Sequence, residues 1–299
     1  MSLAIPAHAR SDNLRGILAM LASMAVFVVN DTLMKIAAGH LPTGEAIFLR
    51  GLLTTAFGAA LIVASGVLRD LPHALSPTVL WRAAADLGGT ITFLSALVHM
   101  PMADIFGILQ FVPLAVTAGA ALFMGAQVGW RRWIATCVGL IGVLLIVRPG
   151  GSAFTPHALL AIVSVLFSAA RDLLSRGVAP GVPPLVIVTT SAAVVTLASL
   201  GFASFETWIQ PSSATVTILL VASVALLAGQ YWLVAAMRTG EIAVVAPFRY
   251  SIILWAILAG YLVWRESPDL ASWVGIAIVT AAGLYTFLRE QRLARAARP

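Results

Sequence analysis

Ten apolar runs, each about as long as a membrane-spanning helix, fill the chain from Leu14 to Leu288. A helix rises 1.5 Å per residue, so about 20 mostly apolar residues cross the ~30 Å hydrocarbon layer of a bilayer. The polar gaps between the runs are short and leave almost no chain for a soluble domain. The pattern predicts an all-α polytopic membrane protein with ten transmembrane helices, at 14–38, 44–66, 78–98, 102–124, 130–147, 158–176, 183–203, 214–237, 242–264 and 269–288.

The second half of the chain repeats the first. At a spacing of 141 residues, segment 30–35 (N-D-T-L-M-K) corresponds to segment 171–176 (R-D-L-L-S-R), with acidic and basic residues in matching places. Each half holds five predicted helices, and because five is odd the two halves enter the membrane from opposite sides, as inverted repeats do. The predicted organisation is an N-terminal tail (1–13), a first five-helix repeat (14–147), a linker (148–157), a second five-helix repeat (158–288) and a basic tail (289–299).

Charge predicts the orientation of these helices. Charged residues make up 10% of the chain, well below the ~25% of soluble domains. Thirteen of the 18 lysines and arginines fall on the side that holds both termini, three (Lys35, Arg148 and Arg265) fall on the opposite side, and two lie inside helices. The positive-inside rule then places both termini in the cytoplasm and the linker on the outer side of the membrane. Tryptophans near the helix ends fit the interfacial belts of such proteins.

Charged residues within the spans suggest gates. An ionisable side chain at the bilayer centre costs at least ~2.5–3.5 kcal/mol, so it normally faces the protein interior. Asp31 and Lys35 are four residues apart near the linker-side end of the first helix, and Asp172 and Arg176 have the same spacing near the opposite end of the sixth. Pairs at this spacing can neutralise each other on one helix face. They are either symmetry-related gates or helix-end pairs that assist insertion.

A second group of residues suggests a cavity. Pro113 and Pro247 should kink the fourth and ninth helices, and irregular backbone in a membrane is tolerated only where it packs on protein or lines a cavity. We therefore expect a cavity between helices 1, 3, 4, 6, 8 and 9, with few fixed charges. For each candidate taken singly, packing within the bundle is favoured over contact with a ligand. The candidate contacts are Gln110, Gln230, Tyr250, Trp255, Asp86, Thr90, Phe93 and Arg249.

Catalytic signatures are missing from the sequence. It contains no H-E-x-x-H, P-loop, G-x-S-x-G or G-x-G-x-x-G motif, and its five histidines lack metal-ligand spacing. We therefore predict no enzyme activity, no catalytic residues, no metal site and no cofactor. The predicted partners are a small-molecule substrate and membrane lipid, without nucleic acid. The oligomeric state stays open, and a monomer is among the alternatives.

Several stretches resemble the EamA-type branch of the drug/metabolite transporter superfamily. They are G-L-I-G-V-L-L-I-V-R-P-G at 139–150, A-P-F-R-Y-S-I-I-L-W-A-I-L-A-G-Y-L-V-W-R-E-S-P-D at 246–269 and G-L-Y-T-F-L-R-E at 283–290. The resemblance covers nearly the whole chain in two units. It implies a five-plus-five inverted fold and export of small metabolites across the bacterial inner membrane, with the aromatic amino-acid exporters as the first members to consider.

One position departs from the family pattern. The family usually has Gly-Glu after its fourth helix, whereas this chain has Gly125-Ala126 there and keeps the acid in the second unit as Arg265-Glu266. The family role of the first glutamate therefore does not carry over to Ala126.

Together these features predict a secondary transporter that exports amino acids or similar amphipathic metabolites by alternating access. An importer of a vitamin or nucleoside-like metabolite on the same fold is the close alternative. A lipid scramblase or channel is an alternative from another class. The sequence leaves the substrate, the direction and the coupling ion open.

Overall fold

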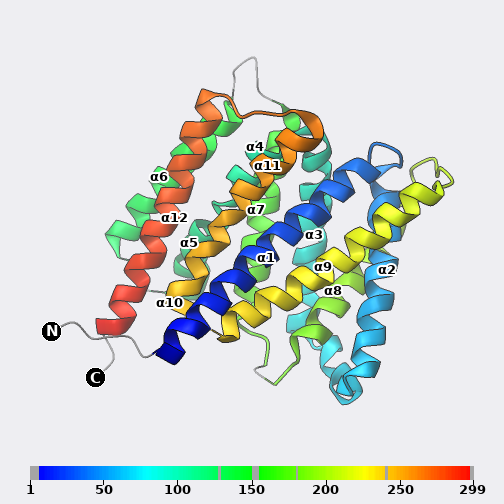
Figure 1. Ribbon diagram of the computed structural model, residues 1–299, viewed down its shortest axis with the longest axis horizontal. Coiled ribbons are helices and arrows are strands. Elements are labelled where there is room, and N and C mark those ends of the chain that lie inside the picture. The colour runs from blue at the N-terminus through cyan, green and yellow to red at the C-terminus, as the bar shows by residue number, and fades with distance from the viewer. Residues whose placement is uncertain (1–6, 127–128, 150–154, 180, 240–241, 297–299) are drawn as a thin grey trace.

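The computed structural model describes residues 7–126, 129–149, 155–179, 181–239 and 242–296, and every regular element in these ranges is a helix (Figure 1). The first described helix begins, and the last described helix ends, at the same end of the bundle, which we call the terminal side. The opposite end, where the last helix of the first repeat ends and the first helix of the second repeat begins, is the linker side. The elements are α1 (Ala7–Ala37), α2 (Thr43–Ala64), η1 (Val67–Leu75), α3 (Pro77–His99), α4 (Met102–Leu109), α5 (Val112–Met124), α6 (Trp130–Val147), α7 (Pro156–Ser175), α8 (Pro184–Ala203), α9 (Ser213–Thr239), α10 (Ile242–Val245), η2 (Ala246–Ser251), α11 (Ile252–Trp264) and α12 (Leu270–Ala296).

The helices confirm a polytopic membrane protein. In the described chain nine helical segments are long and apolar enough to cross a membrane, counting α4–α5 and η2–α11 as one span each. The 23-residue α3 is the tenth span by length, since 23 residues rise about 34 Å. It is more polar than its neighbours because it carries Arg82 and Asp86, which face a central cavity.

The observed helices differ from the predicted ranges mainly at the chain ends. α1 begins at Ala7 and α12 ends at Ala296, so both predicted tails are partly helical. Extending an existing helix adds one hydrogen bond per residue without a new nucleus, and these tails hold good helix formers. The 3₁₀ segment η1, which follows Gly66 at φ 72°, was not predicted. The linker residues 150–154 lie outside the described part of the chain.

The fourth span of each repeat is interrupted, as the prolines predict. α4 ends at Leu109 and α5 begins at Val112, with Pro113 in its first turn. In the second repeat, Pro247 lies within the 3₁₀ segment η2 that precedes α11. Proline has no amide hydrogen and clashes with the preceding turn, so a regular α-helical ladder cannot run through either place. Both interruptions lie in the first half of their span, which is the linker-side half in the first repeat and the terminal-side half in the second, as an inverted repeat requires.

Helix packing shows the inverted repeat directly. α1 packs against α9, and the equivalent helices α7 and α3 pack against each other, while α2 with α8, α6 with α12 and α4 with α11 are pairs of mutually equivalent helices. The closest approaches are also repeated. A Cβ added to Gly229 would lie 2.9 Å from the Phe27 ring, and one added to Gly88 would lie 2.6 Å from the Phe167 ring. Each phenylalanine therefore packs onto a glycine of the other repeat.

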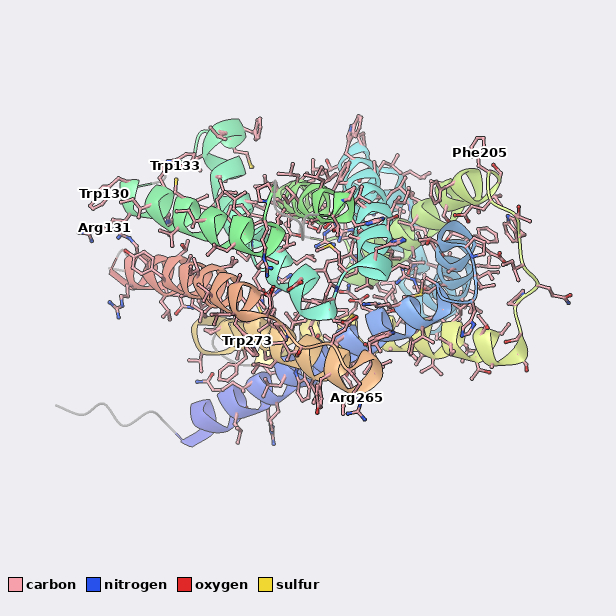
Figure 2. The ribbon with its side chains drawn as sticks, turned by 90° about the horizontal axis from the view of Figure 1, so that it is seen from above. Trp130, Arg131, Trp133, Phe205, Arg265 and Trp273 are labelled. Atoms are coloured by element: carbon pink, nitrogen blue, oxygen red, sulfur yellow. The ribbon has the colours of Figure 1, made fainter. Side chains whose placement is uncertain are left out.

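Exposed aromatic residues mark both ends of the bundle. Figure 2 shows Trp130, Arg131 and Trp133 together at the terminal-side end of α6, while Phe205 lies at the opposite end of the molecule. The Arg131 guanidinium lies 5.3 Å from the Trp130 ring centroid. Amphipathic rings with a neighbouring cation favour the headgroup level of a bilayer. These positions fit the predicted interfacial belts.

Candidate functional site

A central cavity of about 450 Å³ lies between the two repeats. All the helices expected to form its walls do so, namely the first, third, fourth, sixth, eighth and ninth spans. Two further walls, α2 and α8, were not predicted. They contribute residues such as Arg50, Thr54 and Ala192. Arg50 could have been recognised from the sequence, because a charged residue inside a span normally faces the protein interior.

The cavity is far more charged than expected. Its lining holds four arginines (Arg50, Arg82, Arg171 and Arg249) and three aspartates (Asp31, Asp86 and Asp172). The expectation of few fixed charges is therefore wrong. Arg82 and Arg171 had been counted as helix-end charges for the orientation, but the bundle turns both toward the cavity. Charges of both signs let a cavity bind a polar solute away from bulk water.

The charges at the terminal-side end of the cavity pair between helices. Arg171 on α7 donates to Asp86 on α3 at 3.0 Å and to its neighbour Asp172 at 3.0 Å. Arg82 donates to the hydroxyls of Ser175 and Ser191, at 2.9 Å and 2.6 Å. The spacing of charged residues along one helix therefore did not predict these partners. The packing of α3, α7 and α8 against one another brings them together instead.

The same correction applies to Asp172 and Arg176. Sequence spacing suggested that they pair along α7, but Asp172 lies in the cavity and is contacted by Arg171. Arg176 is the C-cap residue of α7 and is exposed. The two side chains therefore lie in different surroundings, one in the cavity and one at the terminal-side surface.

Asp31 and Arg50 lie nearer the linker side. Asp31 accepts a hydrogen bond from the Asn30 side chain at 2.7 Å, and both line the cavity together with Arg50. Asp31 and Asp86 are the carboxylates that act electrostatically on Arg50. Lys35, the partner that the sequence suggested for Asp31, is directed elsewhere.

Five of the predicted cavity contacts lie in the lining, namely Gln230, Asp86, Thr90, Phe93 and Arg249. Gln110, Tyr250 and Trp255 do not. Gln110 is buried between α4 and η2, where its amide donates to the Tyr250 carbonyl oxygen at 3.3 Å. The two residues are 140 positions apart, so this contact joins equivalent places of the two repeats. Their symmetry was predicted, but it brings them together in packing beside the cavity rather than on its surface.

Trp255 is packed between hydrophobic clusters of the bundle. Its indole nitrogen is buried and has no hydrogen-bond partner among the described residues. A large ring on a core-facing side of α11 fills space between helices. In this structure Trp255 therefore packs between helices and lies outside the cavity lining.

A network around Lys35 joins helix ends on the linker side. The Lys35 ammonium donates to Glu266 Oε1 at 2.9 Å and to the Met100 carbonyl at 2.7 Å, and it lies 4.6 Å from the Trp264 ring centroid. Glu266 Oε2 accepts from the Met102 amide at 2.9 Å. This network joins the ends of α1, α3, α4 and α11, and we call it the linker-side lock.

The turn that carries Glu266 has an unusual backbone. Arg265 adopts φ 57°, which is uncommon for a residue other than glycine. The Glu266 amide donates back to the Gly260 carbonyl at 3.1 Å. A Cβ at Gly260 would lie 3.2 Å from Glu266 Oε2, so glycine leaves room for the carboxylate. The turn thereby aims Glu266 across the bundle toward Lys35.

The equivalent turn on the terminal side has the same backbone but lacks the acid. Gly125 adopts φ 65°, and the Ala126 amide donates to the Ala120 carbonyl at 3.1 Å. Ala126 corresponds to Glu266 and the exposed Arg176 corresponds to Lys35. Among the residues that the structure describes, the lock is thus present on the linker side and not on the terminal side.

Two further contacts hold the linker side together. Glu206, just after α8, accepts from the Gly44 and Glu45 amides at the start of α2, both at 3.1 Å. Glu45 is 1% exposed and accepts from the Ile209 amide at 3.0 Å. A carboxylate at a helix N-terminus satisfies free amides and the helix dipole. These hydrogen bonds therefore hold the start of α2 against the end of α8.

An exposed ion pair lies at the linker-side surface. Arg148 and the Ser272 amide both donate to Asp269, and these contacts, with Arg148 the stronger, lower the pKa of Asp269 to about 2. Arg148 is one of the few basic residues predicted for this side. Its contact ties the end of α6 to the start of α12.

Comparisons with known proteins find several transporters that are similar to this chain. The riboflavin transporter of Rhizobium johnstonii is 28% identical over 69% of this chain and 68% of its own length. The S-adenosylmethionine uptake transporter of Rickettsia prowazekii is 24% identical over 93% of this chain and 94% of its own length. The pseudopaline exporter CntI of Pseudomonas aeruginosa is 27% identical over 89% of this chain and 93% of its own length.

A solved crystal structure has the same fold, with a TM-score of 0.62 and 21% identity over 95% of this chain and 99% of that one. The sequence profile of the EamA-like transporter family matches residues 14–148 and again residues 155–288. These two matches cover nearly the whole chain and coincide with the two inverted halves of the bundle. The chain therefore belongs to the EamA-like transporter family.

Proposed function

We propose that the protein is a secondary transporter that moves amino acids or similar small amphipathic metabolites by alternating access. The observation that carries this proposal is a central cavity between inverted repeats with different contacts at its two ends. The cavity lining extends to Arg82 and Asp172, within two turns of the terminal-side helix ends, whereas the lock around Lys35 and Glu266 joins helix ends on the linker side. Exchanging two such arrangements would expose the cavity to each side in turn.

The gating role belongs to the linker-side lock and to the ion pairs of Arg171 near the terminal side. Lys35 and Glu266 hold the linker side closed, and their contacts must break for the cavity to open there. Asp172 and Arg171 connect α7 to α3 near the other end, through Asp86. Rearranging these contacts accompanies closure of the terminal side. Opening and closing are thus coupled through ion pairs between helices, which have two discrete arrangements.

We infer that transport runs outward, from cytoplasm to periplasm, across a bacterial inner membrane. The bias of basic residues toward the terminal side supports cytoplasmic termini. Single cysteines at Gly129 (terminal side) and Thr155 (linker side), in a Cys137→Ser background, test this orientation in intact cells. A membrane-impermeant maleimide should label position 155 and spare position 129. The opposite result would invert the assigned topology and the direction with it.

An importer on the same fold is the second candidate. It is favoured by the two relatives whose names are a riboflavin transporter and an S-adenosylmethionine uptake transporter, while the pseudopaline exporter supports the outward direction. A scramblase or channel, the alternative from another class, would need a continuous groove or pore, and the ion pair of Lys35 and Glu266 between helix ends supports a gated transporter instead.

Counterflow in proteoliposomes separates these functions. Vesicles loaded with unlabelled solute are diluted into the same labelled solute, over a panel of amino acids, riboflavin and nucleosides. A transporter should show saturable, transient accumulation of label for at least one solute. Flux that rises linearly with concentration and lacks counterflow would indicate a pore, and accumulation of riboflavin or a nucleoside alone would favour the second candidate.

A further inference from the structure

Arg50 is the cavity arginine whose guanidinium donors are least used by hydrogen bonds within the protein. It lies in the second turn of α2 and is 9% exposed, and its Nε is buried without a hydrogen-bond partner among the described residues. Its backbone is held firmly, because its carbonyl accepts from Thr54 at 2.9 Å and from Ser223 at 3.2 Å. A buried, unpaired donor is costly in a folded protein, and a ligand that accepts from it recovers that cost.

The other cavity arginines are engaged differently. Arg171 is occupied by Asp86 and Asp172, and Arg82 by two serine hydroxyls. Arg249 is exposed, so water satisfies its donors. A planar guanidinium binds a carboxylate with two parallel hydrogen bonds. Arg50 is therefore the position in this cavity best prepared for an anionic group.

An acceptor of the opposite kind lies in the same part of the cavity. Asn30 is 2% exposed and donates its amide hydrogen to Asp31, which leaves its Oδ1 buried without a hydrogen-bond partner among the described residues. Asp31 adds a carboxylate to the lining beside it. Two oxygens, one of them charged, form a site for an ammonium group, which brings three donors and no acceptor.

Aromatic side chains adjoin these polar groups. Phe27, Phe93 and Phe106 line the cavity, and the Phe93 and Phe106 rings meet edge to face with centroids 5.9 Å apart. Such a wall accommodates an apolar side chain. The polar end alone would suit a small ion, but the apolar wall indicates a ligand with a hydrophobic part.

We propose that Arg50, Asn30 and Asp31 form a binding site for the zwitterionic head group of an α-amino acid. The carboxylate binds the Arg50 guanidinium, and the ammonium group binds Asn30 Oδ1 and Asp31. This assignment rests on the proposed transport function and adds to it a requirement for both charges on one ligand. A lone anion meets the Asp31 carboxylate, and a lone amine meets the Arg50 guanidinium, so each single-charge analogue is disfavoured by one member of the site.

Three matched solutes test this requirement. Counterflow is measured in proteoliposomes with L-phenylalanine, 2-phenylethylamine and 3-phenylpropanoate, and with L-leucine and its two corresponding analogues. We expect saturable exchange of the amino acids, with apparent affinities about tenfold or more higher than those of either analogue. Equal affinity for an amino acid and its amine or acid would overturn the assignment.

Two variants then locate the site. Arg50→Gln should lower amino-acid affinity about tenfold or more and leave the affinity for the amine unchanged or improved, whereas Asp31→Asn should spare the acid. Arg131→Gln is the matched control, since it removes an exposed arginine that lies outside the cavity lining and should change affinity less than threefold. Equal effects of Arg50→Gln and Arg131→Gln on all three solutes would contradict the assignment.

The outcomes separate this inference from the transport proposal. If the wild-type protein shows counterflow of another solute but not of these amino acids, the head-group site is wrong and the transporter stands. If it shows counterflow of no solute in the panel, both fail. Should Arg50→Gln not yield folded protein, judged by size-exclusion profile and thermal unfolding, the wild-type comparison of the three solutes decides alone.

Discussion

Replacing Glu266 with glutamine tests whether the linker-side lock sets the conformational equilibrium. Glu266→Gln keeps the shape of the side chain but removes its charge. Lys35, whose side chain is 8% exposed, then remains buried with the Met100 carbonyl and the Trp264 ring as its neighbours. The closed arrangement loses its main compensation for burying that ammonium group. We therefore expect the linker side to open more often.

The size of the effect follows from the burial of the pair. Breaking a fully buried ion pair costs about 3–5 kcal/mol, and a hydrogen bond to a charged group contributes about 1.5–3 kcal/mol. The Glu266 side chain is 24% exposed, and glutamine still accepts one hydrogen bond, so the lower range applies. A loss of about 2 kcal/mol corresponds to about a 30-fold higher population of the linker-open state.

Cysteine accessibility measures that population. Ser168→Cys places a reporter in the cavity wall on α7, in a Cys137→Ser background, and a membrane-impermeant maleimide is added from the linker side. Where opening and closing are fast compared with labelling, the labelling rate follows the open fraction. The rate should therefore rise about 30-fold in Glu266→Gln relative to its parent.

Asp269→Asn is the matched control for this experiment. Asp269 is a carboxylate on the same side, three residues further along, and its side chain is 56% exposed. Its loss should change the labelling rate less than about twofold, because exposed ion pairs contribute about 0–1 kcal/mol. An unchanged rate in Glu266→Gln, or equal acceleration by both substitutions, would refute the role assigned to the lock.

Three other predictions follow from the structure. Ala126→Glu should supply the missing acid near Arg176 and slow labelling of a cavity cysteine from the terminal side. The expected effect is up to about fivefold, because an exposed ion pair contributes at most about 1 kcal/mol. Faster labelling would contradict the equivalence of Ala126 and Glu266. Trp255→Ala should lower the free energy of unfolding by up to about 3 kcal/mol and reduce transport of all solutes equally, because the ring packs between helices. A selective loss of transport of apolar substrates would instead support a direct contact between Trp255 and the substrate. Because the pKa of Asp269 is lowered to about 2 by Arg148, its stabilising contribution is fully present above about pH 4 and is lost as the pH falls through 2. Unfolding temperatures measured across this range should fall less in Asp269→Asn than in the wild-type protein, and parallel curves would exclude a contribution from this pair.

The sequence predicted the helices well because the formation of each one depends on the residues of its own segment. An apolar run of about 20 residues has one stable state in a bilayer, since every backbone polar group must be satisfied within its own helix. The interruptions at Pro113 and Pro247 were equally predictable, because proline disrupts the hydrogen-bond ladder when it lies in the interior of a helical run. The inverted repeat was visible as well, since matched charges recur 141 residues apart.

Charge pairing was less accessible to sequence reasoning. The spacing of Asp31 and Lys35 describes only their own helix, whereas Lys35 finds Glu266 231 positions away. Arg171 likewise binds Asp86 across α3 and α7. A long side chain reaches several neighbouring helices in a bundle, and the lowest-energy partner depends on which ends meet in space.

The sequence by itself therefore determined the class of protein, the number and place of its helices, the two repeats and the family that they resemble. It also contained the asymmetry between Ala126 and Glu266, although not its meaning. Tertiary structure alone decided which residues line the cavity. Arg50 lies in the lining, whereas Trp255 packs between helices outside it. The physical reason is that helix formation depends on residues a few positions apart, whereas a cavity depends on how helices from both repeats rotate and pack against one another.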